Sequence, residues 1–413
     1  MAHRIPDHGT VLDIGGGNMS SNILDDLRRV FAMAALSGQP PPTMPDELLY
    51  DDKGLAIWAD IIFTPEFYQT RDEITLFKKN SVEIANYIPE GAIMVDLGAG
   101  DMRKVNFLLD QLTRLGREAT YLALDISSRS LTTNLDLLAP EHAGGSVHMA
   151  GLWGDFKAGI DFCVALPSSS PRMFLSLGSV LFNDPWHKAV DSLREWAALM
   201  RRDDLILAGM DGHDVTSAKV WDAYHTHPAL FQDFFCNGLE HANGLLGERV
   251  FKAEDWDICA GIEEDEGRHR FFLKAKQDIA VTAAARGSAE DGIQIIGRGT
   301  ELDWFDAHKR PEWMVTKMCA EAGLEVIRSW AIDGSDMRQY LIRRDHSAEV
   351  SSDRPLIPPT SAERSCSAEV RGKKYGQGSG FRSHVSQHIS GRGEAMGNRK
   401  LTHLQHTQWV KGG

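Results

Sequence analysis

The first two thirds of the chain alternate between short apolar runs and segments in which apolar residues have helical spacing. The run Ile93–Val95 leads into a glycine turn at residues 97–100, and residues 105–115 then place apolar side chains three and four positions apart. A second apolar run, residues 121–124, stops at Asp125. This pattern predicts a strand, a helix and a strand, with glycines at the first turn and a carboxylate at the tip of the second strand.

The alternation continues, with strands predicted at residues 146–149, 172–177 and 204–211 and a helix at residues 189–200. Successive strands joined by helices predict a parallel, doubly wound sheet, which is an α/β fold of the Rossmann-like type. In such sheets ligands bind at the carboxyl ends of the strands. Polar residues fall at each of these ends, and we expect them to form one rim: Asp96, Asp125, Asp155, Ser179 and Asp211.

The glycine turn and Asp125 indicate a cofactor that contains a nucleoside. Glycines let a ligand lie close to the backbone, and Asp125 can accept hydrogen bonds from a pair of ribose hydroxyls. The third glycine of the dinucleotide fingerprint G-x-G-x-x-G would fall at Arg103, so that fingerprint is not met. These features favour a mononucleoside cofactor such as S-adenosylmethionine (SAM) over NAD.

The segments before this core are expected to be helical, with one linker. An amphipathic helix is predicted near residues 21–35. Residues 12–18 ahead of it are interpreted as a turn, and residues 38–45 after it form a proline-rich linker. Thr70 and Glu73 match a capping box, which would begin a further helix.

Beyond residue 216 the chain is expected to form a second, α+β domain. Residues 217–251 are helical and aromatic-rich, a strand follows near residues 271–273, and residues 329–342 are typical of a closing hairpin. Residues 346–413 lack periodicity, hold ten Lys and Arg against five Asp and Glu, and are predicted to be a disordered basic tail. The predicted parts are an N-terminal extension with its linker, the core, a substrate-binding domain that returns to the sheet, and the tail: residues 1–45, 46–216, 217–345 and 346–413.

Composition limits the classes of function. With 42% hydrophobic and 25% charged residues the chain is typical of globular proteins, and its net charge of −14 argues against nucleic-acid binding. Five dispersed cysteines indicate reduced thiols and no metal site. No apolar run reaches the roughly 18 to 20 residues that span a bilayer, and the N-terminus lacks the apolar segment of a secretory signal. We expect a cytoplasmic protein without a membrane or nucleic-acid partner; its oligomeric state, monomer or homodimer, stays open.

Several motifs occur in a distinctive order along residues 48–344. They include YDDKG at residues 50–54, FYQTRDE at 67–73, DLGAG at 96–100 and LGSVLFN at 177–183. This set resembles the histidine Nα-methyltransferase family, whose members include the ergothioneine-pathway enzyme and the fungal 4-dimethylallyltryptophan N-methyltransferase; the chain is closest in character to the latter. The resemblance implies a Rossmann-like methyltransferase core, SAM as the cofactor, and a second domain that closes over an amino-acid substrate.

Carried over position by position, the resemblance also implies which residues bind the ligands. Tyr68, Asn183 and Tyr224 would contact the substrate, and the first two would act in catalysis by orienting its amine. Asn183 offers both a donor and an acceptor to an α-amino or carboxylate group. The cofactor contacts would be Tyr50, Gly98, Lys104, Asp125, Asp155 and Phe156.

The chain departs from the family at the segment where the ergothioneine enzyme recognises imidazole, a Glu-x-Ser followed shortly by a lysine. Alignment on Lys317 puts Trp313 and Val315 at the glutamate and serine positions, which adds both residues to the predicted substrate site. Neither side chain offers imidazole the hydrogen bonds of glutamate and serine, so the site is predicted to favour a bulky, apolar aromatic substrate. A shift of the alignment would put Glu312 in the site instead.

The sequence therefore predicts a SAM-dependent N-methyltransferase. Its substrate would be a small-molecule amine derived from an aromatic amino acid, tryptophan-like or prenylated, in fungal alkaloid or other secondary-metabolite synthesis. Histidine Nα-methylation of the ergothioneine type is the alternative within this class. A catalytically inactive nucleoside-binding module is the alternative from another class.

Overall fold

The structure of the protein is a computed structural model that describes residues 4–34, 40–287 and 292–346. Its main sheet has eight strands in the order β1-β4-β3-β2-β5-β6-β13-β12. The strands from β1 to β6 run parallel, β13 is antiparallel to β6, and β12 is antiparallel to β13. Their bounds are β1 Val11–Asp13, β2 Ala92–Leu97, β3 Ala119–Asp125, β4 Val147–Trp153, β5 Arg172–Ser176, β6 Leu205–Asp211, β12 Leu324–Ala331 and β13 Met337–Arg344.

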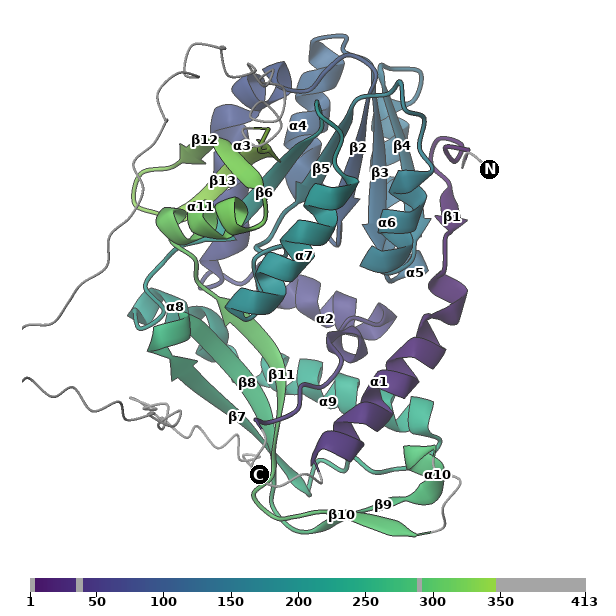
Figure 1. Cartoon of the computed structure of the whole chain (residues 1–413), viewed down its shortest axis with the longest axis vertical. Coiled ribbons are helices and arrows are strands. Elements are labelled where there is room, and N and C mark those ends of the chain that lie inside the picture. The colour runs from purple at the N-terminus through teal and green to yellow at the C-terminus, as the bar shows by residue number, and fades with distance from the viewer. Residues whose placement is uncertain (1–3, 35–39, 288–291, 347–413) are drawn as a thin grey trace, which may run out of the picture. The chain divides into compact units, whose positions relative to one another are not determined.

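Helices cover both faces of this sheet (Figure 1), and a hydrophobic core lies under each layer. One layer contributes buried residues such as Leu76 and Leu108, and the other contributes Phe162 and Leu193. All six residues of β2 are buried, as expected of a strand with helices on both sides. The first layer is α3 Tyr68–Asn86, α4 Arg103–Arg114 and α5 Ser128–His142; the second is α6 Phe156–Val164, α7 Trp186–Leu199 and α11 Glu312–Glu321.

The order of the strands reverses at β2. β3 and β4 lie on one side of it, whereas β5 and β6 lie on the other. The carboxyl ends of β2 and β5 therefore flank the switch point at which doubly wound sheets bind ligands. The predicted Rossmann-like α/β fold is confirmed, and so is the closing hairpin, which is formed by β12 and β13.

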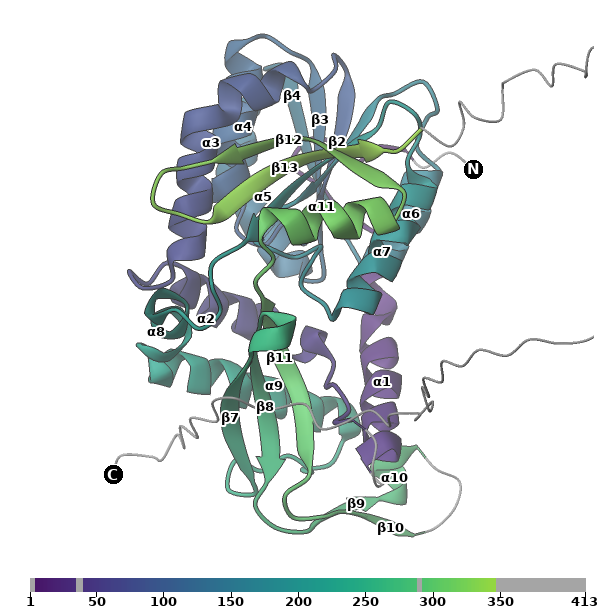
Figure 2. The ribbon, with the colours of Figure 1, turned by 60° about the vertical axis from the view of Figure 1, so that its left-hand side comes forward.

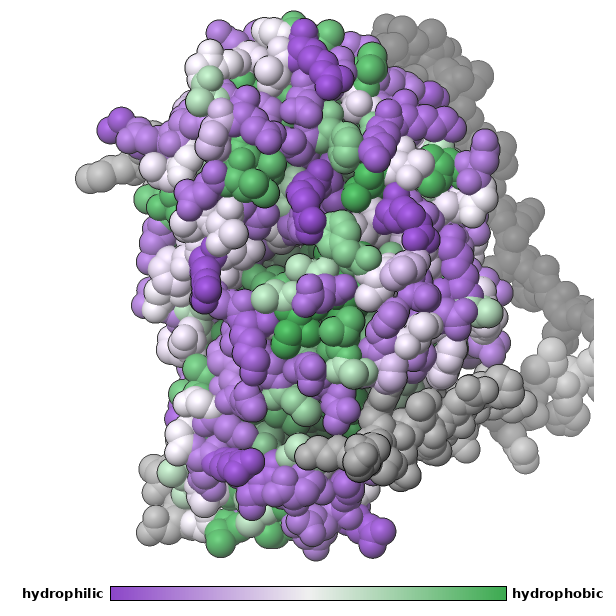
Figure 3. Space-filling model, turned by 180° about the vertical axis from the view of Figure 1, so that it is seen from behind, coloured by the Kyte–Doolittle hydropathy of each residue, from purple (hydrophilic) through white to green (hydrophobic). Residues whose placement is uncertain are grey.

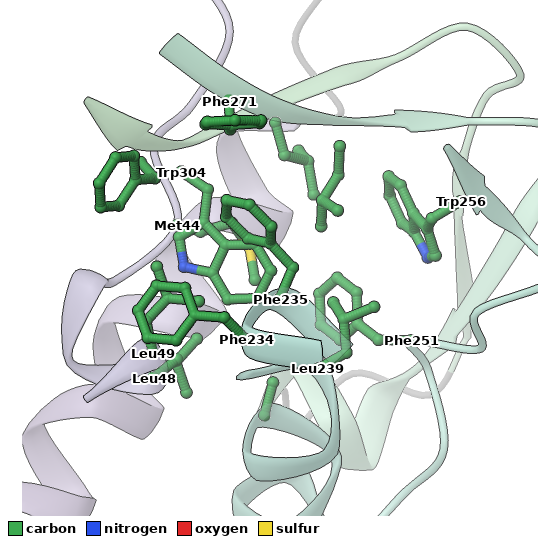
Figure 4. Close-up of a cluster of buried hydrophobic side chains, with 14 of the residues drawn as sticks. Met44, Leu48, Leu49, Phe234, Phe235, Leu239, Phe251, Trp256, Phe271 and Trp304 are labelled. Carbon is green, nitrogen blue, oxygen red and sulfur yellow. The ribbon is translucent and has the colours of Figure 1, made fainter. Parts of the chain in front are cut away.

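A second sheet is antiparallel, with the order β11-β8-β7, and packs against helices from the N-terminal part of the chain and from the segment that follows β6 (Figure 2). Aromatic and aliphatic side chains such as Leu49, Phe234, Phe235 and Trp304 fill the space between them (Figure 4). The strands are β7 Trp256–Glu263, β8 Arg268–Ala275 and β11 Glu301–His308, and a smaller ribbon is formed by β9 Ile279–Thr282 and β10 Ile293–Ile296. The surrounding helices are α1 Met19–Ala34, η2 Asp46–Leu49, α2 Asp52–Ile62, α8 Ala218–His225, α9 Pro228–Leu246 and α10 Ala283–Arg286.

The core beneath the second sheet, called the second core below, does not follow the predicted domain boundaries. One buried cluster contains Ile23 and Leu27 of α1, Leu48 of η2, and residues from α9 and the second sheet. The predicted N-terminal extension thus contributes a strand to the main sheet and a helix to the second core. The predicted tail lies outside the described residues, apart from His346.

Two local predictions are wrong. The segment interpreted as a turn contains β1, which pairs with β4; the chain passes so close to Trp153 that a Cβ on Gly16 would collide with its ring. The capping box is also absent, because α3 begins at Tyr68 and Thr70 lies inside the helix. Glu73 is therefore free for a different role at the rim of the main sheet.

Candidate active site

The glycine turn after β2 leaves an open backbone surface at the switch point. Gly98 and Gly100 have positive φ values of 68° and 48°, which residues with side chains adopt only at a cost. Phe156, the first residue of α6, is 45% exposed. Its ring lies 3.7 Å from the place that a Cβ on Gly98 would take. The bare turn and the exposed ring together fit the flat face of a nucleoside base.

Asp125, at the tip of β3, is held by the backbone around this turn. Its Oδ2 accepts a hydrogen bond from the Gly100 amide at 2.9 Å, and its Oδ1 accepts one from the Ser127 amide at 3.0 Å. Burial raises the pKa of Asp125, and these amides oppose that shift. Each carboxylate oxygen keeps a lone pair, so Asp125 can still accept from ribose hydroxyls.

Two further carboxylates of the predicted rim have protein partners. Asp155 caps α6, because its Oδ1 accepts from the Ala158 amide at 2.8 Å. Asp96 accepts from the Tyr121 hydroxyl at 2.7 Å through Oδ2, and burial raises the pKa of Asp96 to about 7. Its Oδ1 is buried without a hydrogen-bond partner among the described residues. Buried polar atoms are normally satisfied, so this atom is open to a donor from a ligand or a water.

Lys104, in the first turn of α4, forms an ion pair with Glu73 at 2.9 Å. Glu73 is fully buried and accepts from the Gly178 amide at 3.0 Å through both of its oxygens. A Cβ on Gly209 of β6 would collide with Glu73 Oε1, so the carboxylate fills the space that this glycine leaves. Glu73 therefore fixes Lys104 against the loop after β5. Its role was missed because the sequence offers Thr70 as a nearer partner.

Asp211, at the end of β6, is the centre of the predicted substrate region. Its Oδ2 accepts from the Tyr68 hydroxyl at 2.6 Å and from the Lys309 ammonium at 2.8 Å. Its Oδ1 accepts from the His213 ring at 2.6 Å. Although burial raises the pKa of Asp211, Lys309 and His213 hold it well below its usual range. Asp211 is therefore a carboxylate that binds one of the predicted substrate residues directly.

Tyr224, on α8, belongs to the same group. Its hydroxyl oxygen accepts from Lys309 Nζ at 3.1 Å and from Gln69 Nε2 at 2.7 Å. The structure thus joins Tyr68 and Tyr224, which are 156 positions apart in sequence, through Asp211 and Lys309.

Asn183 connects the main sheet to the second one. Its Nδ2 donates to the Asp306 carbonyl at 2.7 Å, and its Oδ1 accepts from the His308 amide at 2.8 Å. The amide thereby holds the end of β11 in place. One N–H and one lone pair remain for a ligand, so the predicted contact with substrate stays a prediction.

Tyr50, predicted to bind the cofactor, lies in an aromatic cluster. Its ring centroid is 6.0 Å from that of Trp58, which is in turn 5.6 Å from that of Phe305. Burial raises the pKa of Tyr50, and nearby Asp46 and Tyr224 raise it further. The next segment of the chain reaches the rim of the main sheet, because the Ser127 hydroxyl donates to Asp52 at 2.7 Å. The segment of Tyr50 and Asp52 therefore connects the aromatic cluster with the turn that follows Asp125.

Val315 does not lie at this site. Its side chain is completely buried in the core under α11, away from the aromatic cluster of Tyr50. Trp313 is 61% exposed and lines a surface cavity of about 490 Å³ together with Gly212 and Arg338. The alternative residue Glu312 is also outside the site, because it is exposed and pairs with Arg338. The predicted substrate contact of Val315 is wrong. No contact among the described residues joins Trp313 to Tyr68 or Tyr224, and its role in the site stays a prediction.

Lys309 is a second lysine on which the family's segment can be aligned. The Lys317 side chain is 60% exposed, whereas the Lys309 side chain is only 2% exposed and contacts both Asp211 and Tyr224. Counted back from Lys309 with the same spacing, the glutamate and serine positions become Phe305 and Ala307. Both lie on β11, and because they are two positions apart they point to the same face of the strand. The alternating pattern of residues 301–308 was the available signal for this strand.

Three further features belong to the described molecule outside this group of residues. Seen from the side opposite to Figure 1, hydrophobic side chains gather near the middle of the surface between hydrophilic ones (Figure 3). No helix within the described ranges is both long and apolar enough to cross a membrane. In the same ranges, no three His, Cys, Asp or Glu side chains are grouped so that they could hold a metal ion.

Comparison with known proteins finds an ergothioneine biosynthesis protein and N-methyltransferases among the relatives of this chain. The chain is 32% identical to ergothioneine biosynthesis protein 1 of Neurospora crassa over 74% of its own length, but spans only 33% of that protein. It is 29% identical to the N-methyltransferase dtpB of Aspergillus flavus, covering 70% of this chain and 80% of the relative. It is 28% identical to the 4-dimethylallyltryptophan N-methyltransferase easF of Arthroderma benhamiae, covering 73% and 89%.

Among solved structures, a 1,6-didemethyltoxoflavin N1-methyltransferase of Burkholderia thailandensis aligns with 74% of this chain and 93% of its own, at 12% identity and a TM-score of 0.33. The sequence profile of the family described as "Histidine-specific methyltransferase, SAM-dependent" matches residues 27–344. This range includes the glycine turn, both tyrosines and Lys309. The chain therefore belongs to the family of SAM-dependent, histidine-specific methyltransferases.

Proposed function

We propose that the protein methylates the amine of a tryptophan-like substrate, with SAM as the methyl donor. The observation that carries this proposal is the identity of the residues on β11 that face Tyr224. When the family's segment is aligned on Lys309 instead of Lys317, Phe305 and Ala307 take the positions of the glutamate and serine that recognise imidazole. A phenylalanine and an alanine offer no hydrogen bond to imidazole, whereas they pack well against an indole or a prenyl group.

The aromatic cluster supports the same class of substrate. Tyr50 and Trp58 are half-buried, and the ring of Phe305 lies 6.3 Å from that of Tyr224 between their centroids. Phe67 and Phe234 complete the cluster, with centroids 5.6 and 5.4 Å from that of Trp58. Such rings bind flat apolar groups by stacking and edge contacts.

The residues of the chain have distinct tasks in this proposal. Gly98 and Asp125, together with the ring of Phe156, fit the nucleoside part of SAM, and the Lys104 ammonium suits its carboxylate. When bound, SAM supplies a sulfonium methyl group that a neutral amine can attack in line. Tyr68 and Asn183 would orient that amine, and burial of the tyrosines excludes water from the site.

The names of the relatives are in keeping with this proposal. The A. benhamiae relative is named for 4-dimethylallyltryptophan, which is a prenylated tryptophan. We extend the proposal to secondary-metabolite synthesis on this ground. Histidine remains the second candidate, because the N. crassa relative is an ergothioneine biosynthesis protein and the family is described as histidine-specific.

A methyl-transfer assay tests the proposal. The protein is incubated with methyl-labelled SAM and, separately, with L-tryptophan, 4-dimethylallyl-L-tryptophan and L-histidine, and the products are identified by mass spectrometry. We expect label on the amine of a tryptophan-like compound. Transfer to histidine alone would favour the second candidate. Binding of SAM by calorimetry without transfer to any compound would favour an inactive binding module.

The proposed compartment is the cytoplasm. Three of the described cysteines, Cys163, Cys259 and Cys319, are buried as thiols. Burial raises the pKa of the Cys163 thiol to about 12, so this thiol is inert rather than reactive. Fractionation of cells that express the tagged chain would check the compartment.

A further inference from the structure

The hydrogen bonds around Asp211 treat the two tyrosines of the site differently. Tyr68 donates to Asp211, whereas Tyr224 accepts from Lys309, the ammonium that is paired with Asp211. The distinction matters because a phenol has one proton to donate and two lone pairs with which to accept. What each hydroxyl does inside the protein decides what it can offer to a ligand.

The hydroxyl proton of Tyr68 is used in a hydrogen bond within the protein. Its Oη lies 2.6 Å from Asp211 Oδ2, and a carboxylate can only accept, so the phenol must donate. Asp211 stays ionised because Lys309 and His213 hold its pKa well below the usual range against the effect of burial. Tyr68 is therefore left with lone pairs, which are suited to accept from an N–H group.

Tyr224 has the opposite polarity. An ammonium can only donate, so the contact of 3.1 Å from Lys309 Nζ occupies one lone pair of the phenol oxygen. Gln69 Nε2 donates to the same oxygen at 2.7 Å. The proton of Tyr224 takes part in neither bond. It remains for an acceptor such as a carboxylate oxygen.

We propose that Asp211, Lys309 and Gln69 are positioning residues that give the tyrosines opposite polarity, so that Tyr68 accepts from the substrate amine and Tyr224 donates to a carboxylate beside it. This assignment rests on the proposed function for the nature of the substrate. It deepens that function, because it selects an amino acid over the corresponding decarboxylated amine. Asp211 connects both halves through a single carboxylate oxygen, which contacts Tyr68 and Lys309.

Binding of three indole compounds tests the two polarities separately. L-tryptophan carries both groups, tryptamine only the amine, and indole-3-propionate only the carboxylate. Affinities are measured by calorimetry with the protein saturated with S-adenosylhomocysteine, so no turnover is needed. The variant Gln69→Glu replaces a donor by an acceptor of the same shape, which would take the Tyr224 proton. We expect this variant to bind L-tryptophan and indole-3-propionate more weakly by about tenfold or more, and to bind tryptamine with unchanged affinity.

Asp211→Asn is the matched test for Tyr68. The neutral amide no longer demands the Tyr68 proton, so we expect weaker binding of the two amines and a smaller effect on indole-3-propionate. Lys309→Gln keeps a donor to Tyr224 and should preserve carboxylate binding better than Lys309→Met. Equal losses for all three compounds in Gln69→Glu and Asp211→Asn, at unchanged melting temperature, would overturn the proposal.

A second measurement keeps the proposal testable if the protein binds none of these compounds, an outcome that would count against the proposed substrate. Tyrosinate absorbance is followed against pH in the full chain. In the wild type, burial and then Asp211 raise the pKa of Tyr68 far above its usual value, with further contributions from Tyr224 and Asp72. Lys219 Nζ lies 4.4 Å from the centroid of the Tyr68 ring, and the centroid of the His213 ring lies 4.7 Å from it. Lys309 contacts the same Asp211 oxygen as the Tyr68 hydroxyl.

Asp211→Asn removes the negative charge and leaves Lys309 to favour the phenolate. We therefore expect one more tyrosine to ionise at a lower pH than in the wild type. That extra step should vanish in the double variant Tyr68→Phe/Asp211→Asn. Superimposable titration curves for the wild type and Asp211→Asn would show that Asp211 does not hold the Tyr68 proton, which would refute the assignment.

Discussion

Individual carboxylates near the rim of the main sheet hold backbone turns and lysine side chains in place. Asp125 accepts from two amides, Glu73 pairs with Lys104, and Asp211 pairs with Lys309. Because these groups are buried, loss of one partner leaves the other without compensation. Substitutions of single carboxylates can therefore distinguish effects on cofactor binding from effects on the free energy of unfolding.

Asp125→Ala should weaken SAM binding by about tenfold or more, because it removes the acceptor proposed for the ribose hydroxyls and frees two amides. Calorimetric titration with SAM measures the effect. Asp136→Ala is the matched control, since Asp136 is exposed on the neighbouring helix α5. Equal affinities in the wild type and the Asp125 variant would contradict the assignment of Asp125.

Glu73→Gln keeps an acceptor for the Gly178 amide but removes the charge that holds Lys104. We expect a free energy of unfolding lower by about 3 kcal/mol, as for other broken buried pairs, together with weaker SAM binding. Chemical denaturation and calorimetry measure the two effects. Glu83→Gln, on the same helix but only half-buried and paired with Arg328, should change neither.

At the scale of elements, β11 and α8 are the segments that carry the second sheet to the site. Asn183 binds the backbone of β11, and Tyr224 and His225 stand at the end of α8. β11 supplies Phe305 and leads directly into Lys309, and α8 supplies Tyr224. Their attachment should therefore affect turnover more than cofactor binding.

Asn183→Ala should keep SAM binding and lose most turnover. The variant loses two hydrogen bonds to β11, which would also lower the free energy of unfolding by about 1 to 3 kcal/mol. A methyl-transfer assay and denaturation of the same sample measure both effects. Wild-type turnover in this variant would remove Asn183 from the proposed site, and Asn22→Ala, at an exposed position of α1, is the control.

Acid should loosen the contact between α8 and β8. His225 Nε2 lies 2.9 Å from His269 Nε2, and burial lowers the pKa of His225 to about 4. The pKa of His269 is lowered by burial and then by His225. Because histidine in the unfolded chain titrates near about 6.5, the unfolded state binds more protons between pH 6.5 and 4.

Stability should therefore fall as the pH falls through this window, by at most about 1.4 kcal/mol per pH unit for each histidine. Thermal unfolding at successive pH values measures the slope. His225→Gln should reduce it. An unchanged slope in this variant would show that His225 does not contribute.

At the scale of the whole molecule, the sequence predicted the features that depend on residues close together in the chain. The buried run of β2 and the glycine turn were readable because their period and composition are set within a few residues, and the same holds for Asp125. The partners of Glu73 and Lys309 were not readable, since Lys104 and Asp211 lie 31 and 98 positions away. Only the folded chain brings them together.

The second core shows the same limit. α1 and η2 come from the N-terminal end, yet they pack with α9 and with β11, which lies more than 200 positions later. The apolar face of α1 was visible in the sequence, but its partner was not. For the same reason the family's Glu-x-Ser segment was aligned on the exposed Lys317, and no strand was predicted for the residues around Phe305.

The specificity constant of the wild-type protein tests the central claim most directly. Initial rates of methyl transfer are measured at saturating SAM for 4-dimethylallyl-L-tryptophan, L-tryptophan and L-histidine, and kcat/KM is compared. The aromatic cluster around Phe305 predicts that kcat/KM for at least one tryptophan-like amine exceeds the value for histidine by about a hundredfold. A difference of this size is expected because the site lacks hydrogen-bond partners for the imidazole ring. A higher kcat/KM for histidine would contradict the claim.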